Sequence, residues 1–182
     1  EHAARVHAMA IGPGLTHEQP VLEFLRVLWS SWGKPAVIDA DALNALTLGV
    51  ELPNAPCVLT PHPGELSRML QMSIAEIQAD RFRAVRMAVE KFGKSVLLKG
   101  PYSLVGSAGE PVSVNSTGNP GMATGGMGDV LAGMIGTLLA QELQPNYAAS
   151  VAAMWHGAAG DIAAQEIGPI GYSASEVADR LP

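Results

Sequence analysis

The chain has 182 residues and a formal net charge of −6, from 11 basic and 17 acidic side chains. Hydrophobic residues make up 48% of the sequence and charged residues 15%, which is typical of a globular domain with a large core. Lysine and arginine do not cluster, so we expect neither nucleic acid nor an anionic membrane as a partner. The single cysteine, Cys57, excludes an internal disulfide, and no apolar run reaches membrane-spanning length. These features predict a cytoplasmic protein.

Short apolar runs alternate with helical patterns along the chain. Strands are predicted at residues 8–11, 36–38, 57–59 and 95–98, with a hairpin at 103–105 and 112–114. Helices are predicted at residues 21–32, 42–48, 73–92, 128–141, 146–165 and 175–181. The helix at 73–92 carries a capping box at Ser73 and Glu76 and a glycine stop at Gly93. Continuous apolar strands separated by helices predict one α/β domain over residues 1–182, with a mostly parallel sheet and helices on both faces.

Polar or glycine-rich segments follow four of the predicted strands. They are Gly12–Gly14, Asp39 with Asp41, His62 with Glu65, and Lys99–Gly100. In open parallel sheets, ligands bind beyond the carboxyl ends of the strands. We therefore expect these four segments to meet in one crevice, together with the glycine-rich segment at 118–129.

The segment 118–129, Gly-Asn-Pro-Gly-Met-Ala-Thr-Gly-Gly-Met-Gly-Asp, is the most informative motif in the chain. Five glycines precede or open an apolar helix, whose first N–H groups have no internal partner and carry partial positive charge. This combination predicts an anion site that suits a phosphate. The motif lacks the Lys and Ser/Thr of a Walker P-loop, and it does not open a βαβ unit as a Rossmann fingerprint does.

Asp129 stands where this helix begins. A fixed negative charge beside a phosphate site is unfavourable unless it serves a purpose. A base that removes a proton from an attacking hydroxyl would serve one. The alternative is that Asp129 only caps the helix, and the spacing alone favours neither reading.

Five segments, in this order, resemble the signatures of the ADP- or ATP-dependent NAD(P)H-hydrate dehydratases, a branch of the ribokinase-like superfamily. They are Gly12–Leu15, Asp39–Asn44, Thr60–Glu65, Leu98–Gly100 and Asn119–Asp129. The resemblance spans nearly the whole chain, and the last segment is its most specific part. It implies a three-layer αβα ribokinase-like fold. Since the family has further strands before the Gly-Pro-Gly strand, the resemblance also implies a domain that is truncated at its N-terminus.

The resemblance implies an enzyme of cofactor repair, a carbon–oxygen lyase. Its substrates would be NADHX and NADPHX, in which water has added across a double bond of the nicotinamide ring. ADP or ATP would phosphorylate the ring hydroxyl, and elimination of phosphate would regenerate NAD(P)H. Asp129 would accept the hydroxyl proton, while the backbone N–H groups of Gly126, Met127 and Gly128 would hold the phosphate and Mg²⁺ would offset its charge.

The resemblance also assigns binding residues. Gly14 and His62, together with Asp129, would contact the hydrated dinucleotide, and Glu65 would organise Mg²⁺ through water. The adenine nucleotide would contact Lys99, Gly100, Pro101, Tyr102, Ser103 and Gly128. Taken from the residues alone, His62 is a satisfied loop residue, Glu65 a carboxylate in a first helical turn, and Asp41 a helix cap.

Two other functions are compatible with these motifs. A ribokinase-like kinase of a small alcohol or vitamin precursor would use the same Asp129 and anion site, but would leave the phosphate on its product. A non-catalytic nucleotide-binding fragment would bind ADP without turnover. The resemblance also allows a homo-oligomer.

Overall fold

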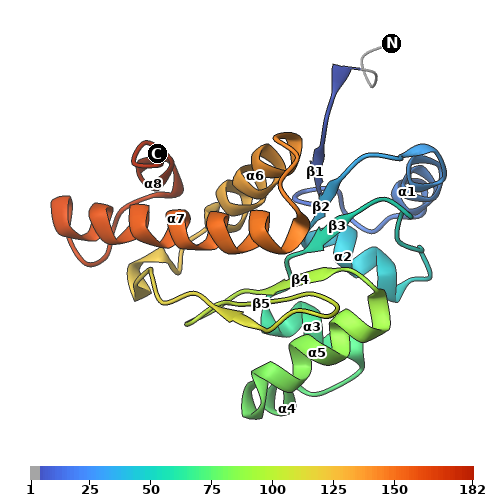
Figure 1. The fold of residues 1–182 in the computed structure, drawn as a ribbon, viewed down its shortest axis with the longest axis horizontal. Coiled ribbons are helices and arrows are strands. Elements are labelled where there is room, and N and C mark those ends of the chain that lie inside the picture. Colours follow the sequence, from blue (N-terminus) through green and yellow to red (C-terminus); the bar gives the residue numbers. More distant parts are fainter. Residues whose placement is uncertain (1–4) are drawn as a thin grey trace.

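The computed structural model of the protein describes residues 5–182 (Figure 1). Its strands are β1 (Met9–Ile11), β2 (Ala36–Ile38), β3 (Cys57–Leu59), β4 (Ser95–Leu98), β5 (Leu104–Gly106) and β6 (Ser113–Val114). Within the described range they form one sheet in the order β1-β2-β3-β4-β5-β6. The pairs from β1 to β4 are parallel, β5 pairs antiparallel with β4, and β6 pairs antiparallel with β5. The predicted mostly parallel sheet and its hairpin are therefore confirmed.

Helices cover both faces of this sheet. They are α1 (Gln19–Ser31), α2 (Ala40–Thr47), α3 (Pro63–Leu70), α4 (Ile74–Ala79), α5 (Arg81–Phe92), α6 (Met127–Ala140), α7 (Pro145–Glu166) and α8 (Ala174–Ala178), with a short 3-10 turn, η2 (Pro120–Met122). Figure 1 shows α6, α7 and α8 on one side of the sheet and α3, α4 and α5 on the other. No helix among residues 5–182 has the length and apolar character needed to cross a bilayer.

The sheet separates two hydrophobic cores, because successive side chains of a strand point to opposite faces. Ile38 and Leu59 pack against the helices from α1 to α5. Val37 and Val58, their neighbours in sequence, pack against α6 and α7 instead. Each such side chain contributes roughly 1.5–3 kcal/mol when it is fully buried. This division gives the three αβα layers and explains why the strands are apolar without interruption.

The prediction of one continuous helix at 73–92 is wrong. The chain leaves the helical conformation at Asp80, where φ is −145° and ψ is 82°, and α4 and α5 lie on either side of it. The Asp80 carboxylate accepts a hydrogen bond of 2.9 Å from the backbone N–H of Arg83, so Asp80 caps α5. The capping box at Ser73 and the left-handed stop at Gly93 are confirmed.

The remaining predicted helices are present, with ends that differ by a few residues. Helix α3 was not predicted as an element, although Glu65 was considered as a carboxylate in a first helical turn. It starts directly at Pro63, whose fixed φ suits the first helical position. Thr60–Glu65 thus leads from a strand into a helix rather than into a long loop.

Candidate active site

The carboxyl ends of β1, β2, β3 and β4 are joined by hydrogen bonds that continue beyond the strands. The N–H of Asp39 donates to Ile11 O at 3.0 Å, and the N–H of Lys99 donates to Pro61 O at 2.9 Å. The N–H of Thr60 donates to Ile38 O at 3.1 Å. The four segments predicted to share a crevice therefore follow each other along one edge of the sheet.

The loop after β1 passes very close to the backbone at the end of β2. A Cβ atom at Gly12, where φ is +140°, would lie 1.7 Å from the carbonyl oxygen of Asp39, so only glycine fits there. Gly14, at φ +73°, has no atom within 4 Å of the position its Cβ would take. That open space leaves the predicted contact of Gly14 with a dinucleotide as a prediction. The same loop is held by the Asp41 carboxylate, which accepts a 2.9 Å hydrogen bond from the N–H of Thr16.

The interpretation of Asp41 as the cap of the following helix is wrong. Asp41 lies in the first turn of α2, and the N-cap position belongs to Asp39. The Asp41 side chain turns to Thr16 instead. Asp39 does not use its side chain to cap α2 either.

His62 and Glu65 form a reciprocal capping box at the start of α3. The Nδ1 atom of His62 accepts hydrogen bonds from Gly64 N at 3.0 Å and Glu65 N at 3.3 Å. The Oε2 atom of Glu65 accepts from the N–H of His62 at 2.8 Å. Because Nδ1 is an acceptor, the neutral ring carries its proton on Nε2, which lies 3.5 Å from Glu65 Oε1. The imidazole is half exposed, so it serves the helix and still faces solvent at the crevice.

A partly buried ion pair lies between the ends of β2 and β4. The Nζ atom of Lys99 is 2.7 Å from Asp39 Oδ1 and 3.9 Å from Glu65 Oε2. The Asp39 side chain is only 3% exposed, and that of Lys99 is 21% exposed. A Cβ atom at Gly128 would lie 3.6 Å from both Asp39 Oδ2 and Lys99 Nζ. The structure thus brings Asp39, Glu65, Lys99 and Gly128 together.

Helix α6 opens with backbone N–H groups that have no partner. Gly126 is its N-cap and adopts the left-handed conformation, with φ at +85°. The N–H groups of Asp129 and Val130 both donate to Gly126 O at 3.1 Å. In the described part of the chain, the N–H groups of Gly126, Met127 and Gly128 make no hydrogen bond. They are the three predicted to hold a phosphate, and their geometry suits an anion.

The Asp129 side chain is exposed in the first turn of α6. Its carboxylate makes no hydrogen bond or ion pair with any of residues 5–182. The interpretation of Asp129 as the helix cap is therefore wrong, because Gly126 occupies that position. The carboxylate is free to meet a substrate, and its role as a base stays a prediction.

The glycine-rich segment is anchored to α7 by Asp161 and to the connection between α7 and α8 by Tyr172, which the sequence analysis did not single out. Asp161 accepts a 2.9 Å hydrogen bond from the N–H of Gly118 and a 3.0 Å bond from Asn119 Nδ2. Tyr172 donates its hydroxyl proton to Asn119 Oδ1. The string Trp-His-Gly-Ala-Ala-Gly-Asp161 was a signal for this contact, because its small residues let the loop approach the helix.

Arg81, the first residue of α5, donates hydrogen bonds to the predicted nucleotide loop, Lys99–Ser103, and to the residue before it. Its guanidinium donates to the carbonyl oxygens of Leu98 at 3.4 Å, of Lys99 at 3.5 Å, and of Pro101. Burial lowers the pKa of this guanidinium from its usual value. Arginine remains charged even so, and its planar fork suits several carbonyl groups at once. The sequence analysis missed Arg81, because nothing in its local pattern marks it.

The rest of this loop is compact but faces solvent. Ser103 Oγ donates to Gly100 O at 3.0 Å, which closes the turn between β4 and β5. Tyr102 lies exposed with a positive φ of 52°, which is uncommon for a residue with a side chain. The assignment of these five residues to the adenine nucleotide stays a prediction.

His156 is buried in α7, and its Nε2 atom has no hydrogen-bond partner among the described residues. Burial lowers the pKa of this imidazole from 6.5 to about 4, so the ring is neutral near pH 7. It donates to none of the site residues named above. We treat it as a packing residue.

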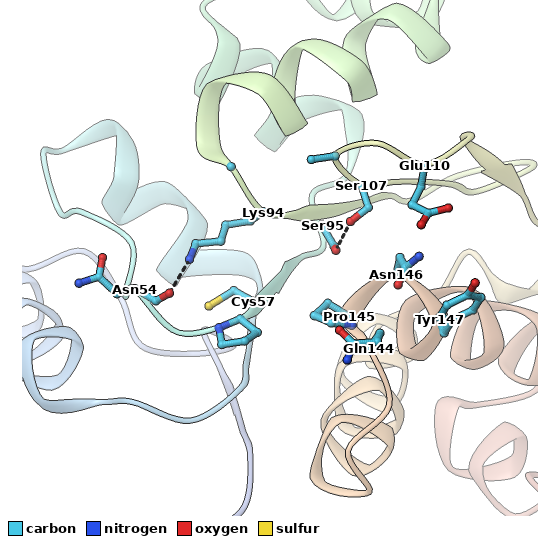
Figure 2. Close-up of a pocket in the computed structure, with 13 residues that line it drawn as sticks. Asn54, Cys57, Lys94, Ser95, Ser107, Glu110, Gln144, Pro145, Asn146 and Tyr147 are labelled. Atoms are coloured by element: carbon cyan, nitrogen blue, oxygen red, sulfur yellow. Dashed lines mark hydrogen bonds between the residues drawn. The ribbon is translucent and has the colours of Figure 1, made fainter.

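The surface formed by residues 5–182 includes two hollows of interest. The first, of about 360 Å³, adjoins the glycine-rich segment and is lined by Pro120, Gly121, Ala123, Thr124, Ile170, Gly171, Tyr172 and Ser173. The second, of about 470 Å³, lies at the amino ends of β3 and β4, where Ser95 and Ser107 face the start of α7 and Lys94 turns to the carbonyl oxygen of Asn54 (Figure 2). None of the predicted site residues lines this second hollow. Burial raises the pKa of its Cys57 thiol to about 11, which excludes a thiolate nucleophile there.

Comparison with known proteins places these features in one family. The family model described as NAD(P)H-hydrate dehydratase matches residues 1–182. The bifunctional NAD(P)H-hydrate repair enzyme Nnr of Moorella thermoacetica is 42% identical over 185 residues, which cover 100% of this chain and 35% of that protein. The chain thus spans about a third of the length of that relative.

Solved structures agree with the sequence relatives. The Bacillus subtilis ADP/ATP-dependent NAD(P)H-hydrate dehydratase, co-crystallised with ATP/Mg²⁺, superposes with a TM-score of 0.86 at 31% identity, over 97% of this chain and 62% of that one. A ribokinase-like superfamily protein from Enterococcus faecalis superposes with a TM-score of 0.83 at 29% identity, over 97% of this chain and 61% of that one. The predicted ribokinase-like fold is confirmed. Since the family model spans every residue of the chain, the protein belongs to the NAD(P)H-hydrate dehydratase family.

Proposed function

We propose that the chain catalyses nucleotide-dependent dehydration of NADHX and NADPHX, restoring NADH and NADPH. The observation that carries the proposal is the start of α6, where three unpaired backbone N–H groups and the free carboxylate of Asp129 share one turn. A phosphate site and a base are what phosphorylation of a hydroxyl needs. The relatives described above carry this activity in their names.

In the proposed reaction, the oxygen of the ring hydroxyl attacks the terminal phosphorus of ADP or ATP. Asp129 accepts the proton that this hydroxyl loses. The bond from that phosphorus to the bridging oxygen breaks, and AMP or ADP leaves. The N–H groups of Gly126, Met127 and Gly128 hold the transferring phosphoryl group. Phosphate is a far better leaving group than hydroxide. It therefore departs with the electrons of the C–O bond, and loss of a proton from the neighbouring ring carbon restores the double bond.

Mg²⁺ fits this site as an ion bound mainly by nucleotide phosphates and water. Among residues 5–182, no group of three or more His, Cys, Asp or Glu side chains could hold a metal directly. Mg²⁺ commonly keeps several waters and binds through one or two carboxylates together with phosphates. Both oxygens of Glu65 already face protein groups, so we propose that it acts through water. When bound, the ion would neutralise charge on the phosphates.

We propose the remaining contacts from the same crevice. Gly14 and His62 contact the hydrated dinucleotide, which is supported by the open space at Gly14 and the half-exposed imidazole. The loop 99–103, with Gly128, contacts the adenine nucleotide, which is supported by its position beside α6.

We also propose one ribokinase-like domain over the whole chain, located in the cytoplasm. A reducing compartment suits Cys57, the single cysteine, whose thiol is buried and unpaired. Association of several copies is part of the same proposal. Exposed Met154, Trp155 and Ile162 on α7 support it, because such side chains gain from being covered.

Product analysis tests the function. The chain is incubated with NADHX, Mg²⁺ and ADP or ATP, and both restored NADH and inorganic phosphate are measured. We expect one phosphate for each NADH formed, and no NADH without nucleotide. A kinase would leave the phosphate on the substrate and restore no NADH, and that result would contradict the proposal.

A further inference from the structure

Asp39 has a buried carboxylate that does not cap the helix beside it. It occupies the N-cap position of α2, where an aspartate normally accepts a hydrogen bond from the first turn. Its side chain makes no such bond. Instead the carboxylate crosses the end of β3 to reach the ammonium of Lys99, at 2.7 Å. An ion pair with a buried partner is weak evidence for added stability, because the buried carboxylate loses its hydration and the ammonium loses part of its own. Stability alone therefore does not explain why Asp39 pairs with Lys99, and we look for a role in ligand binding.

The ammonium group held by Asp39 lies at the first turn of α6. A Cβ atom at Gly128 would be 3.6 Å from Lys99 Nζ, and Gly128 is the second residue of that helix. A cation is unfavourable at a helix N-terminus, where the peptide dipoles already carry positive charge. A bound anion would remove that conflict. Until an anion binds, the carboxylates of Asp39 and Glu65, at 2.7 and 3.9 Å, compensate the charge of Lys99.

We propose that Asp39 is a positioning residue for the phosphate site of α6. It holds the Lys99 ammonium beside Gly128, so that the ammonium and the free N–H groups of the helix bind the terminal phosphate of the nucleotide together. This inference rests on the proposed phosphoryl transfer and deepens it. It assigns Lys99 to the reacting phosphate rather than to the adenosine part of the nucleotide.

The test measures how much each phosphate adds to nucleotide binding. Affinities for AMP, ADP and ATP with Mg²⁺ are measured by calorimetry for the wild-type chain, Lys99→Met, Asp39→Asn and the double variant. We expect Lys99→Met to reduce the preference for ADP and ATP over AMP by about tenfold, since charge-assisted hydrogen bonds are the strong ones. Affinity for AMP should change by less than about twofold in the same variant, since AMP lacks the terminal phosphate that the ammonium meets.

The effect of Asp39→Asn separates positioning from support of the fold. If Asp39 acts through Lys99, Asp39→Asn lowers the same phosphate preference and adds nothing further in the Lys99→Met background. Asp39→Ser is made alongside, because serine is a good N-cap residue and preserves the start of α2. Lys94→Met is the matched control. Lys94 lies just before the amino end of β4, whereas Lys99 follows its carboxyl end. The Lys94 ammonium donates to the carbonyl oxygens of Asn54 and Ala55.

Each outcome decides the question. Equal weakening of AMP, ADP and ATP binding by Asp39→Asn and Asp39→Ser, with a lower melting temperature, would mean that Asp39 only supports the fold. Independent losses from the two single variants would show that Asp39 does not act through Lys99. A chain that binds the three nucleotides equally, or binds none, overturns the inference. Phosphate-dependent binding without restoration of NADH would contradict the proposed function alone.

Discussion

His62 is a residue with two tasks, and substitutions can separate them. Its Nδ1 atom caps α3, while its half-exposed ring faces the crevice where we place the dinucleotide. Asparagine is a strong N-cap residue, so it can replace the cap without replacing the imidazole.

We predict that His62→Asn preserves the free energy of unfolding and raises the KM for NADHX. His62→Ala should raise KM similarly and also destabilise the protein by about 1 kcal/mol, the usual loss on removing an N-cap. Chemical denaturation and steady-state kinetics of both variants check this. If His62→Asn leaves the KM unchanged, the imidazole has only its structural task.

At the scale of single residues, the sequence was sufficient to predict the phosphate site but not the ion pair beside it. The unpaired N–H groups of Gly126, Met127 and Gly128 follow from local chain geometry, so the glycine-rich motif was sufficient to predict them. The pairing of Asp39 with Lys99 joins residues 60 positions apart. The sequence predicts that the two segments share a crevice, but the direct pairing depends on the order of the strands, which no local pattern contains.

At the scale of single elements, the loop 99–103 depends on a side chain from another element. Arg81 at the start of α5 donates to the carbonyl oxygens of Lys99 and Pro101 in this loop and of Leu98, which precedes it. The loop itself includes two residues with positive φ, Gly100 and Tyr102, so it needs external support to keep its shape.

We predict that Arg81→Met lowers the free energy of unfolding by about 1–3 kcal/mol, the usual cost of leaving buried hydrogen-bonding groups unpaired. Affinity for ATP should fall as well, because the loop loses its fixed conformation. Arg83→Met is the control on the same helix, with an exposed side chain. Denaturation and nucleotide titration measure both effects. Equal behaviour of the two variants would contradict the support that we assign to Arg81.

Helix breaks were the elements least accessible to sequence analysis. The pattern from Ser73 to Phe92 fits one helix, and Asp80 has neither the ring of proline nor the freedom of glycine to mark a break. The break follows from the Asp80 side chain capping α5, together with tertiary packing of Ile77 and Val85 in the same core. Capping boxes and glycine stops are local, and those were predicted correctly.

At the scale of the whole molecule, the division into two cores could be predicted in outline. Uninterrupted apolar strands required a cover on both faces, which the helices provide on either side of Val37 and Ile38. The order of the parallel strands from β1 to β4 could not be predicted in the same way, because these strands are too short and too uniformly apolar to specify their neighbours.

Acid stability of the molecule should depend on His156. Burial lowers the pKa of this imidazole to about 4, whereas an unfolded chain protonates it near 6.5. The unfolded state therefore binds more protons between these values, and stability falls as the pH decreases from about 6.5 to 4.

We predict that His156→Gln loses less stability than the wild type over this pH range, by up to roughly 3 kcal/mol. Urea denaturation at several pH values measures the difference. His7→Gln, at an exposed histidine, should follow the wild-type curve. Parallel curves for the wild type and His156→Gln would contradict a neutral buried imidazole.

The most direct test of the account concerns Asp129. The absorbance of the reduced nicotinamide ring is followed after NADHX, Mg²⁺ and ATP or ADP are added to wild-type protein, Asp129→Asn and Glu90→Gln. Glu90→Gln makes the same carboxylate-to-amide change at an exposed site on α5. We expect nucleotide-dependent recovery in the wild type and Glu90→Gln, and a loss of at least about 10²-fold in kcat for Asp129→Asn, the usual contribution of a general base. Recovery at the wild-type rate in Asp129→Asn would contradict the central role of this carboxylate.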